Sequence, residues 1–178
     1  MLLNIWRRDV QPAADRTRRR ASPEVLEDRI PAMSDIEKPI IRVLETYKSA
    51  IHAKDVGALM RLYDPRVRVF DMWGVWSYEG AASWQLAVEA WFTSLGTEKV
   101  KVTFDEVQTS GDTHFAMVSA IVTYAGLSGQ GEQLRVMQNR LSWALRTSGH
   151  VLRIVHEHTS APVGFDDAKA ILCREQGS

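Results

Sequence analysis

The 178-residue chain lacks several features that would place it in a membrane, in a disulfide-stabilised class or among nucleic-acid-binding proteins. No run of about 18 apolar residues, the length needed for a membrane-spanning helix, occurs in it. Its single cysteine, Cys173, cannot form an internal disulfide, which fits a reducing cytoplasm. Basic residues (22) balance acidic residues (22), so the strong positive charge typical of nucleic-acid binding is missing. We therefore expect a cytoplasmic protein with no membrane or nucleic-acid partner.

The remaining pattern divides the chain into a leader, one domain and a tail. Residues 1–33 are rich in arginine and have little apolar periodicity, which predicts a flexible leader. A basic anchor for an anionic surface is an alternative, and Met33 could be the true start. Residues 34–165 suit a single folded domain, and residues 166–178 are expected to form a C-terminal tail.

Apolar residues at helical spacing predict three helices in the first half of the domain. The second helix is predicted over residues 56–63 with Asp55 as its cap, and the third follows Gly80. The apolar stripes contain Ile36, Ile40, Val43, Leu44, Tyr47 and Ile51 in the first helix, Leu59, Met60 and Tyr63 in the second, and Trp84, Val88, Trp91, Phe92 and Leu95 in the third.

Alternation with a period of two predicts strands before and after the third helix. The glycines of "GLSGQG" join two strands and do not lead into a helix, so they indicate a turn and not a phosphate loop. The predicted strands cover residues 67–73, 99–108, 113–125 and 132–146, and a last strand follows "RTSG". Helices followed by antiparallel strands are typical of an α+β domain with helices on one face of a curved sheet.

Isolated polar side chains interrupt the faces that this pattern predicts to be buried. In "LRIVHEHTSAP", residues 152–162, strict alternation continues the apolar row of Ile154 into His156 and His158. Three further elements each place one polar residue on an apolar face: Tyr47 in the first helix, Asp71 in the first strand and Asn139 in the strand over residues 132–146. Burying such groups without partners costs roughly 1–3 kcal/mol each. We therefore expect these five side chains to meet around a pocket as its catalytic groups.

Apolar and aromatic residues near these positions are the predicted walls of that pocket. Most of the tryptophans are expected in the core, but some could also face a ligand. The candidate lining residues are Trp73, Trp76, Trp143, Met137 and Ile154.

Each candidate also has a structural interpretation. Asp71 could form a turn, Tyr47 and Asn139 could be satisfied inside the core, and the two histidines could pair with carboxylates or lie at a subunit contact. His156, His158 and Asp71 could instead form a two-histidine, one-carboxylate metal triad. Because that spacing is unspecific, we expect neither a metal nor another cofactor.

One long stretch resembles a known family. "YKSAIHAKDVGALMRLYDPRVRVFDMWG", followed by "YEG", resembles the opening of ketosteroid isomerases and SnoaL-like polyketide cyclases, members of the nuclear transport factor 2-like superfamily. "HEHTSAP" resembles the last strand of many SnoaL-like proteins, and the resemblance covers residues 36–162. It implies a cone-shaped fold, with three N-terminal helices packed on a curved, mainly antiparallel sheet that encloses a pocket. It also implies a homodimer built on the outer face of the sheet.

The resemblance also implies roles for individual residues. Tyr47 matches the oxyanion-hole tyrosine of the isomerases, and Asp71 matches their general base. Asn139 aligns with a second oxyanion group, a protonated carboxylic acid in that family, and an amide can also donate a hydrogen bond. His156 and His158 depart from the family pattern, because the isomerases have apolar residues there.

Three classes of function remain open on this basis. The first is a proton-transfer isomerase or cyclase acting on a small hydrophobic carbonyl compound. In it, Asp71 or a histidine removes a proton, Tyr47 and Asn139 hold the enolate oxygen, and the other histidine returns the proton. The second is a ligand-binding domain without catalysis. The third is an oligomerisation domain, as in kinase association domains.

Overall fold

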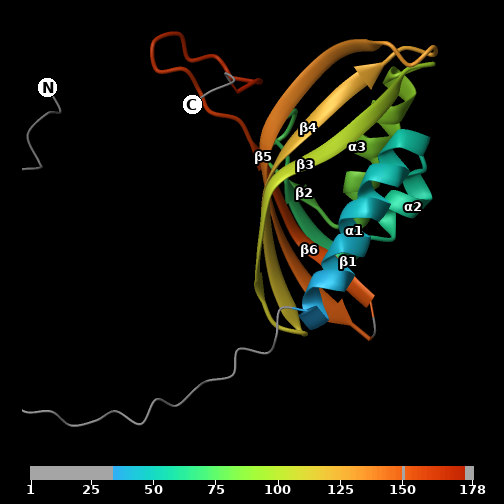
Figure 1. Ribbon diagram of the computed structural model, residues 1–178, viewed down its shortest axis with the longest axis vertical. Helices are drawn as coiled ribbons and strands as arrows, with labels where there is room; N and C mark the ends of the chain where they lie inside the picture. Colours follow the sequence, from blue (N-terminus) through green and yellow to red (C-terminus); the bar gives the residue numbers. More distant parts are fainter. Residues whose placement is uncertain (1–33, 150, 175–178) are drawn as a thin grey trace, which may run out of the picture.

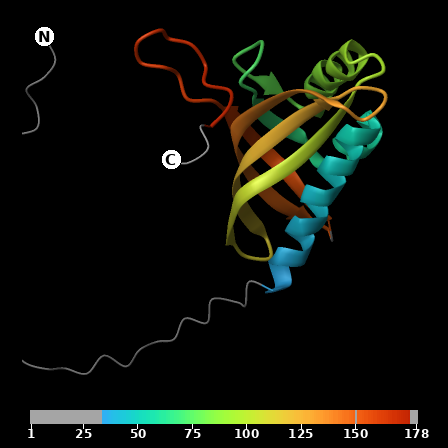
Figure 2. The same ribbon diagram turned by 45° about the horizontal axis from the view of Figure 1, so that its top comes forward.

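The computed structural model describes residues 34–149 and 151–174. The predicted leader, residues 1–33, lies outside the described residues. Three helices pack against the concave face of one curved six-stranded sheet (Figure 1). Figure 2 shows the sheet curving around the helices. The prediction of an α+β, cone-shaped fold with a mainly antiparallel sheet is thereby confirmed.

Each helix packs its apolar side against the sheet. All six predicted stripe residues of the first helix are buried in the core, and Asp55 caps the second helix by accepting a hydrogen bond from Ala58 N at 2.8 Å. The helices are α1 (Ser34–Ala53), α2 (Val56–Met60) and α3 (Ala81–Ser94). None of these three helices has the length and apolar content required to cross a membrane.

The sheet has the strand order β2-β1-β6-β5-β4-β3, in which β1 and β6 are parallel and the other neighbours are antiparallel. The strands are β1 (Tyr63–Phe70), β2 (Tyr78–Glu79), β3 (Lys99–Gly111), β4 (Phe115–Leu127), β5 (Gln133–Ser148) and β6 (Val151–Ser160). The predicted strands of the second half are confirmed within a few residues. The short β2 carries too few residues to show alternation, and the sequence did not predict it.

The boundary between α2 and β1 differs from the prediction. Tyr63 was predicted to end the second helix, but it begins β1 and pairs with Ile154 of β6. Ile154 N also donates to Leu62 O at 2.8 Å. Pairing with a strand some 90 residues away in the chain overrides the local helical pattern here. The first strand is therefore shifted toward the N-terminus, and Asp71 follows its end.

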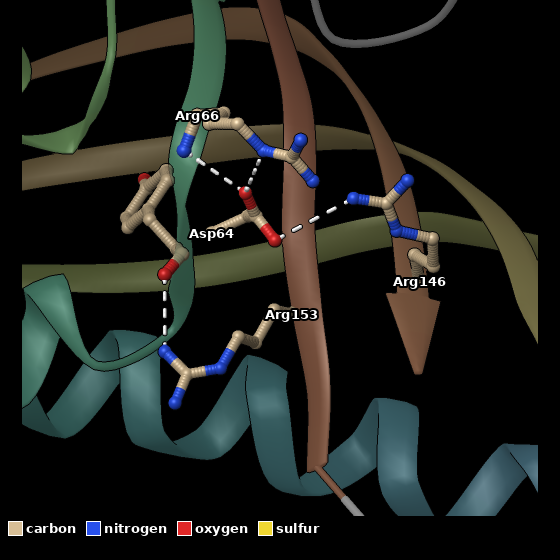
Figure 3. A network of polar contacts seen from close by, with 5 residues as sticks. Asp64, Arg66, Arg146 and Arg153 are labelled. Atoms are coloured by element: carbon tan, nitrogen blue, oxygen red, sulfur yellow. Dashed lines mark hydrogen bonds and ion pairs between the residues drawn. The ribbon is translucent and has the colours of Figure 1, made fainter. Parts of the chain in front are cut away.

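An ionic network anchors the start of β1 to its neighbours in the sheet (Figure 3). Asp64 is buried, and its carboxylate accepts a hydrogen bond from Arg66 N at 2.9 Å and lies 3.6 Å from Arg146 Nη2. Arg153 Nη1 donates to Tyr63 O at 3.2 Å. The network joins residues of β1, β5 and β6, and so supports the position of Tyr63, whose side chain points to the other face of β1.

The C-terminal segment, residues 161–174, contacts the sheet. It loops out beyond β6 and returns to β5 (Figure 1). Within the loop, Gly164 N donates to Lys169 O, and Ile171 N donates to Pro162 O, both at 2.8 Å. The part of the predicted tail that is described, residues 166–174, thus contacts the domain.

Candidate functional site

A cavity of about 600 Å³ lies between the helices and the concave face of the sheet. Its walls are mostly apolar and aromatic, and α1, α3, the β1–β2 loop, β4, β5 and β6 all contribute to them. Polar side chains also line it from the sheet and α1: Tyr47, Asp71, Tyr78, Tyr124, Arg135, Asn139, Glu157 and Thr159. A mainly apolar cavity with a few convergent polar groups is typical of a small-molecule site.

The last strand presents a different residue to the cavity from the one that alternation predicts. β6 is regular up to Ile154, which pairs with Leu145, but the next pair is His156 with Ala144. Val155 is therefore an extra residue, a β-bulge, and the side-chain faces exchange after it. Glu157 and Thr159 turn inward and are buried, at 1% and 4% exposure.

The prediction that His156 and His158 continue the apolar row of Ile154 is consequently wrong. Both lie on the outer side of the sheet, where their rings pack edge-on against Phe70 at centroid distances of 5.0 and 5.8 Å. His156 Nδ1 lies 2.8 Å from Arg68 O, and His158 lines a second, outer depression that Asp71 and Thr159 also border. Neither lines the cavity.

Glu157 is one of the cavity residues that the sequence analysis did not identify. Its Oε2 accepts hydrogen bonds from Tyr63 Oη at 2.6 Å and from Trp143 Nε1 at 2.8 Å. Burial raises the pKa of this carboxyl group to about 7, although the two hydrogen bonds oppose the shift. At neutral pH the group is thus close to the midpoint of its titration. No local signal marked it, because the bulge that turns it inward depends on pairing with β1 and β5.

Asp71 lies at the end of β1, where the sequence placed it, and faces the cavity. Its Oδ1 accepts a hydrogen bond from Thr159 Oγ1 at 2.8 Å, and Thr159 Oγ1 accepts one from Met72 N at 2.8 Å. Partial burial raises the pKa of Asp71, against the opposing effect of the Thr159 hydrogen bond. Each of the two acidic groups therefore holds its proton more tightly than an exposed carboxylate does.

Tyr47 also reaches the cavity, and it is paired there with Tyr124 of β4. The two hydroxyl oxygens are 3.0 Å apart. Burial raises the pKa of both tyrosines, and the nearby Glu157 carboxylate raises each further. Both phenols consequently stay protonated at neutral pH. In such a pair one hydroxyl donates to the other, so the accepting hydroxyl keeps its own hydrogen for a ligand oxygen.

Asn139 faces the cavity from β5 and is 5% exposed. Among the described residues, no hydrogen-bond partner reaches its Oδ1. Buried amides are normally satisfied, so this atom is suited to a ligand or a water molecule. Tyr47, Asp71 and Asn139, three of the five candidates, are thus brought together on one cavity.

The predicted wall residues divide between the cavity, the core and the surface. Trp73 and Met137 line the cavity. Trp143 and Ile154 are fully buried behind it, and Trp143 acts on the site through its hydrogen bond to Glu157. Trp76 is 98% exposed and lines the outer depression beside His158. The aromatic wall comes instead from Tyr78, Trp84 and Trp91.

The metal triad considered from the sequence is not assembled. His156 and His158 lie on the opposite face of the sheet from the cavity. Within residues 34–149 and 151–174, no group of three or more histidine, cysteine, aspartate or glutamate side chains is placed to hold a metal ion.

The curved sheet, its three helices and the cavity between them define a protein of the nuclear transport factor 2-like fold. A protein of that fold and of unknown function from Pseudomonas putida superposes with a TM-score of 0.71 at 18% identity, covering 80% of this chain and 97% of its own. A nuclear transport factor 2-like superfamily protein from Salmonella enterica gives a TM-score of 0.61 at 18% identity, covering 79% of this chain and 100% of its own. The protein Aln2 from a Streptomyces species gives 0.63 at 14% identity, covering 71% and 90%.

The sequence itself assigns the chain to a family within this fold. The SnoaL-like domain family matches residues 40–164, well over half of the chain. The protein therefore belongs to the SnoaL-like domain family. No curated protein sequence matches the chain.

Proposed function

We propose that this protein is an enzyme that transfers a proton on a small, hydrophobic carbonyl compound, as an isomerase or an aldol-type cyclase. The observation that supports this most is the presence of two carboxyl groups with raised pKa, Asp71 and Glu157, in one apolar cavity. General acid–base catalysis works best when the pKa of the catalytic group lies near the working pH. The protonated Tyr47–Tyr124 pair lines the same cavity.

The proposed chemistry assigns one task to each group. The Asp71 carboxylate takes the acidic proton next to the carbonyl, and the electron pair of that C–H bond moves onto the carbonyl oxygen. A phenol hydrogen of the Tyr47–Tyr124 pair donates to the resulting enolate oxygen, and the Asn139 amide lies on the same wall. The carboxylic acid of Glu157 supplies a proton to the new position. Glu157 thereby takes the role that the sequence gave to a histidine.

Replacing Asp71 by asparagine tests this assignment. The amide keeps the size of the side chain and can still accept the Thr159 hydrogen bond, but it cannot take up a proton. We expect the exchange of the α-protons of cyclic ketones in D₂O, followed by NMR, to slow by about 100-fold or more while ketone affinity is unchanged.

Asp105→Asn is the matched control, because Asp105 is exposed on β3. It should exchange α-protons at the wild-type rate. Unchanged exchange in the Asp71→Asn variant would remove Asp71 as the base. If the wild type binds ketones and exchanges none of their protons, the pocket is a binding site without catalysis, the alternative function of this fold.

We also propose that the protein forms a homodimer through the outer face of its sheet. The helices cover the concave face and leave the outer face of β4, β5 and β6 open (Figure 1). At its centre, the short side chains of Ser119 and Ser142 pair, and the exposed apolar Met117 pairs with the small Ala144. Small residues allow two sheets to approach closely, which supports a second copy of the chain as the partner.

A further inference from the structure

The cavity wall includes one residue from beyond the matched family domain. β6 ends at Ser160, opposite Arg140, whereas β5 begins at Gln133. The first half of β5, residues 133–139, therefore has no β6 partner on that edge. This is also the part of β5 that carries Met137 and Asn139 into the cavity. An open edge here would leave backbone groups unpaired and the wall incomplete.

Residues 171–174, named the strap below, occupy that edge. Gln138 N donates to Leu172 O at 2.6 Å, which continues the hydrogen bonding where β6 has ended. Arg174 N donates to Gln138 Oε1 at 2.8 Å. Cys173 Sγ lies 3.6 Å from Val136 O. The strap is thus held along β5 by backbone and side-chain contacts.

An ion pair with β3 holds the end of the strap. The Arg174 guanidinium pairs with Glu106 Oε1. Glu106 lies in a bulge of β3, between Asp105 and Gln108, and its φ of 52° is in the left-handed region that non-glycine residues rarely adopt. The bulge breaks the alternation of β3 at the residue that pairs with the strap.

Adjacent residues of the strap face in different directions. Leu172 is partly buried and lines the cavity, whereas Ile171 is 49% exposed and is not among the cavity residues. The family match ends at residue 164, so the strap lies outside the matched domain.

We propose that Leu172 completes the cavity wall where β6 ends and limits the length of the ligand that the cavity accepts. The inference rests on the proposed function only in requiring that the cavity bind a small apolar molecule. A shorter side chain at this position extends the cavity along β5, and a larger one shortens it.

A series of para-alkylphenols, from ethyl to octyl, tests this inference by isothermal titration calorimetry. Each buried methylene strengthens binding by about fourfold until the alkyl chain reaches the wall. In the wild type we expect affinity to rise with chain length and then to fall. Leu172→Ala should move that maximum by about two methylenes toward longer chains, and Leu172→Trp should move it toward shorter chains.

Ile171→Ala and Ile171→Trp are the matched controls on the same strap, and both should keep the wild-type length profile. Thermal unfolding of each variant shows whether the domain stays folded. Identical profiles for the wild type and both Leu172 variants would overturn the inference and leave the proposed function standing. Failure of every alkylphenol to bind the wild type would overturn the proposed function and this inference with it.

Discussion

Glu157 is an ionisable side chain in a buried position of the cavity wall. Its carboxyl group is buried beside Tyr63 and Trp143, which both donate to Oε2. Two neutral donors stabilise the ionised form, yet the low polarity of the surroundings outweighs them and raises the pKa from 4.5 to about 7. A group of this kind can be either acid or base near neutral pH.

The raised pKa of Glu157 predicts a pH dependence of stability. Between pH 4.5 and 7 the folded protein keeps a proton that the unfolded chain releases, so the free energy of unfolding falls as the pH rises through this window. The stabilisation is complete below the lower value and lost above the upper one. The pKa shift corresponds to about 3 kcal/mol. Glu157→Gln should remove this fall, measured by urea unfolding across the pH range.

The control for this experiment is Glu132→Gln, which changes an exposed carboxylate on the β4–β5 turn. It should keep the wild-type pH dependence. Parallel curves for the wild type and Glu157→Gln would show that Glu157 titrates normally and is accessible to water.

Other site residues could be found from the sequence because they lie in regular elements. Tyr47 lies on the apolar stripe of α1, and Asn139 lies on the same face of β5 as the apolar Met137 and Leu141. For these two residues, helical spacing or strict alternation was enough to predict the face. Asp71 follows the end of β1, and its position rested on a resemblance as well. Tyr124 was missed because it occupies a regular apolar position of β4, where a tyrosine does not stand out.

At the scale of elements, the helices and the long hairpins were predictable, and the irregular points were not. The α1 stripe and the alternation of β3, β4 and β5 are local patterns that survive folding. The bulge at Val155 is different, because β6 pairs with β5 on one edge and β1 on the other. The extra residue is visible only when all three strands are in register, so alternation alone put the histidines inside.

The position of the strap could not be predicted from the sequence either, because it depends on pairing between distant segments. Residues 171–174 contain no pattern that separates them from an exposed tail. Their position is set by the unpaired edge of β5, which exists because β6 is shorter than β5. The start of β1 at Tyr63 is likewise set by pairing with β6 and not by a local sequence pattern.

At the scale of the whole molecule, the proposed dimer predicts the effect of a single charge on the open sheet face. Ala144 lies at the centre of that face, between Met117 and His156. Ala144→Arg would bury a guanidinium at the interface without a partner, so we expect light scattering to give the mass of one chain for the variant and two for the wild type.

Ala82→Arg is the matched control, because it places the same side chain on the exposed start of α3. It should keep the wild-type mass. A wild-type mass of one chain at every concentration, or a dimeric Ala144→Arg variant, would place the contact elsewhere or exclude it.

The fold brings ionisable groups from separate elements to one cavity, and Glu157 is one of them. The most direct test is a carbon-13 NMR titration of the glutamate carboxyl groups, with Glu157→Gln used to assign the resonance. We expect a midpoint of about 7 that shifts when para-butylphenol occupies the cavity. A midpoint near 4.5 that stays the same when the phenol is added would contradict the placement of Glu157 in a ligand-binding cavity.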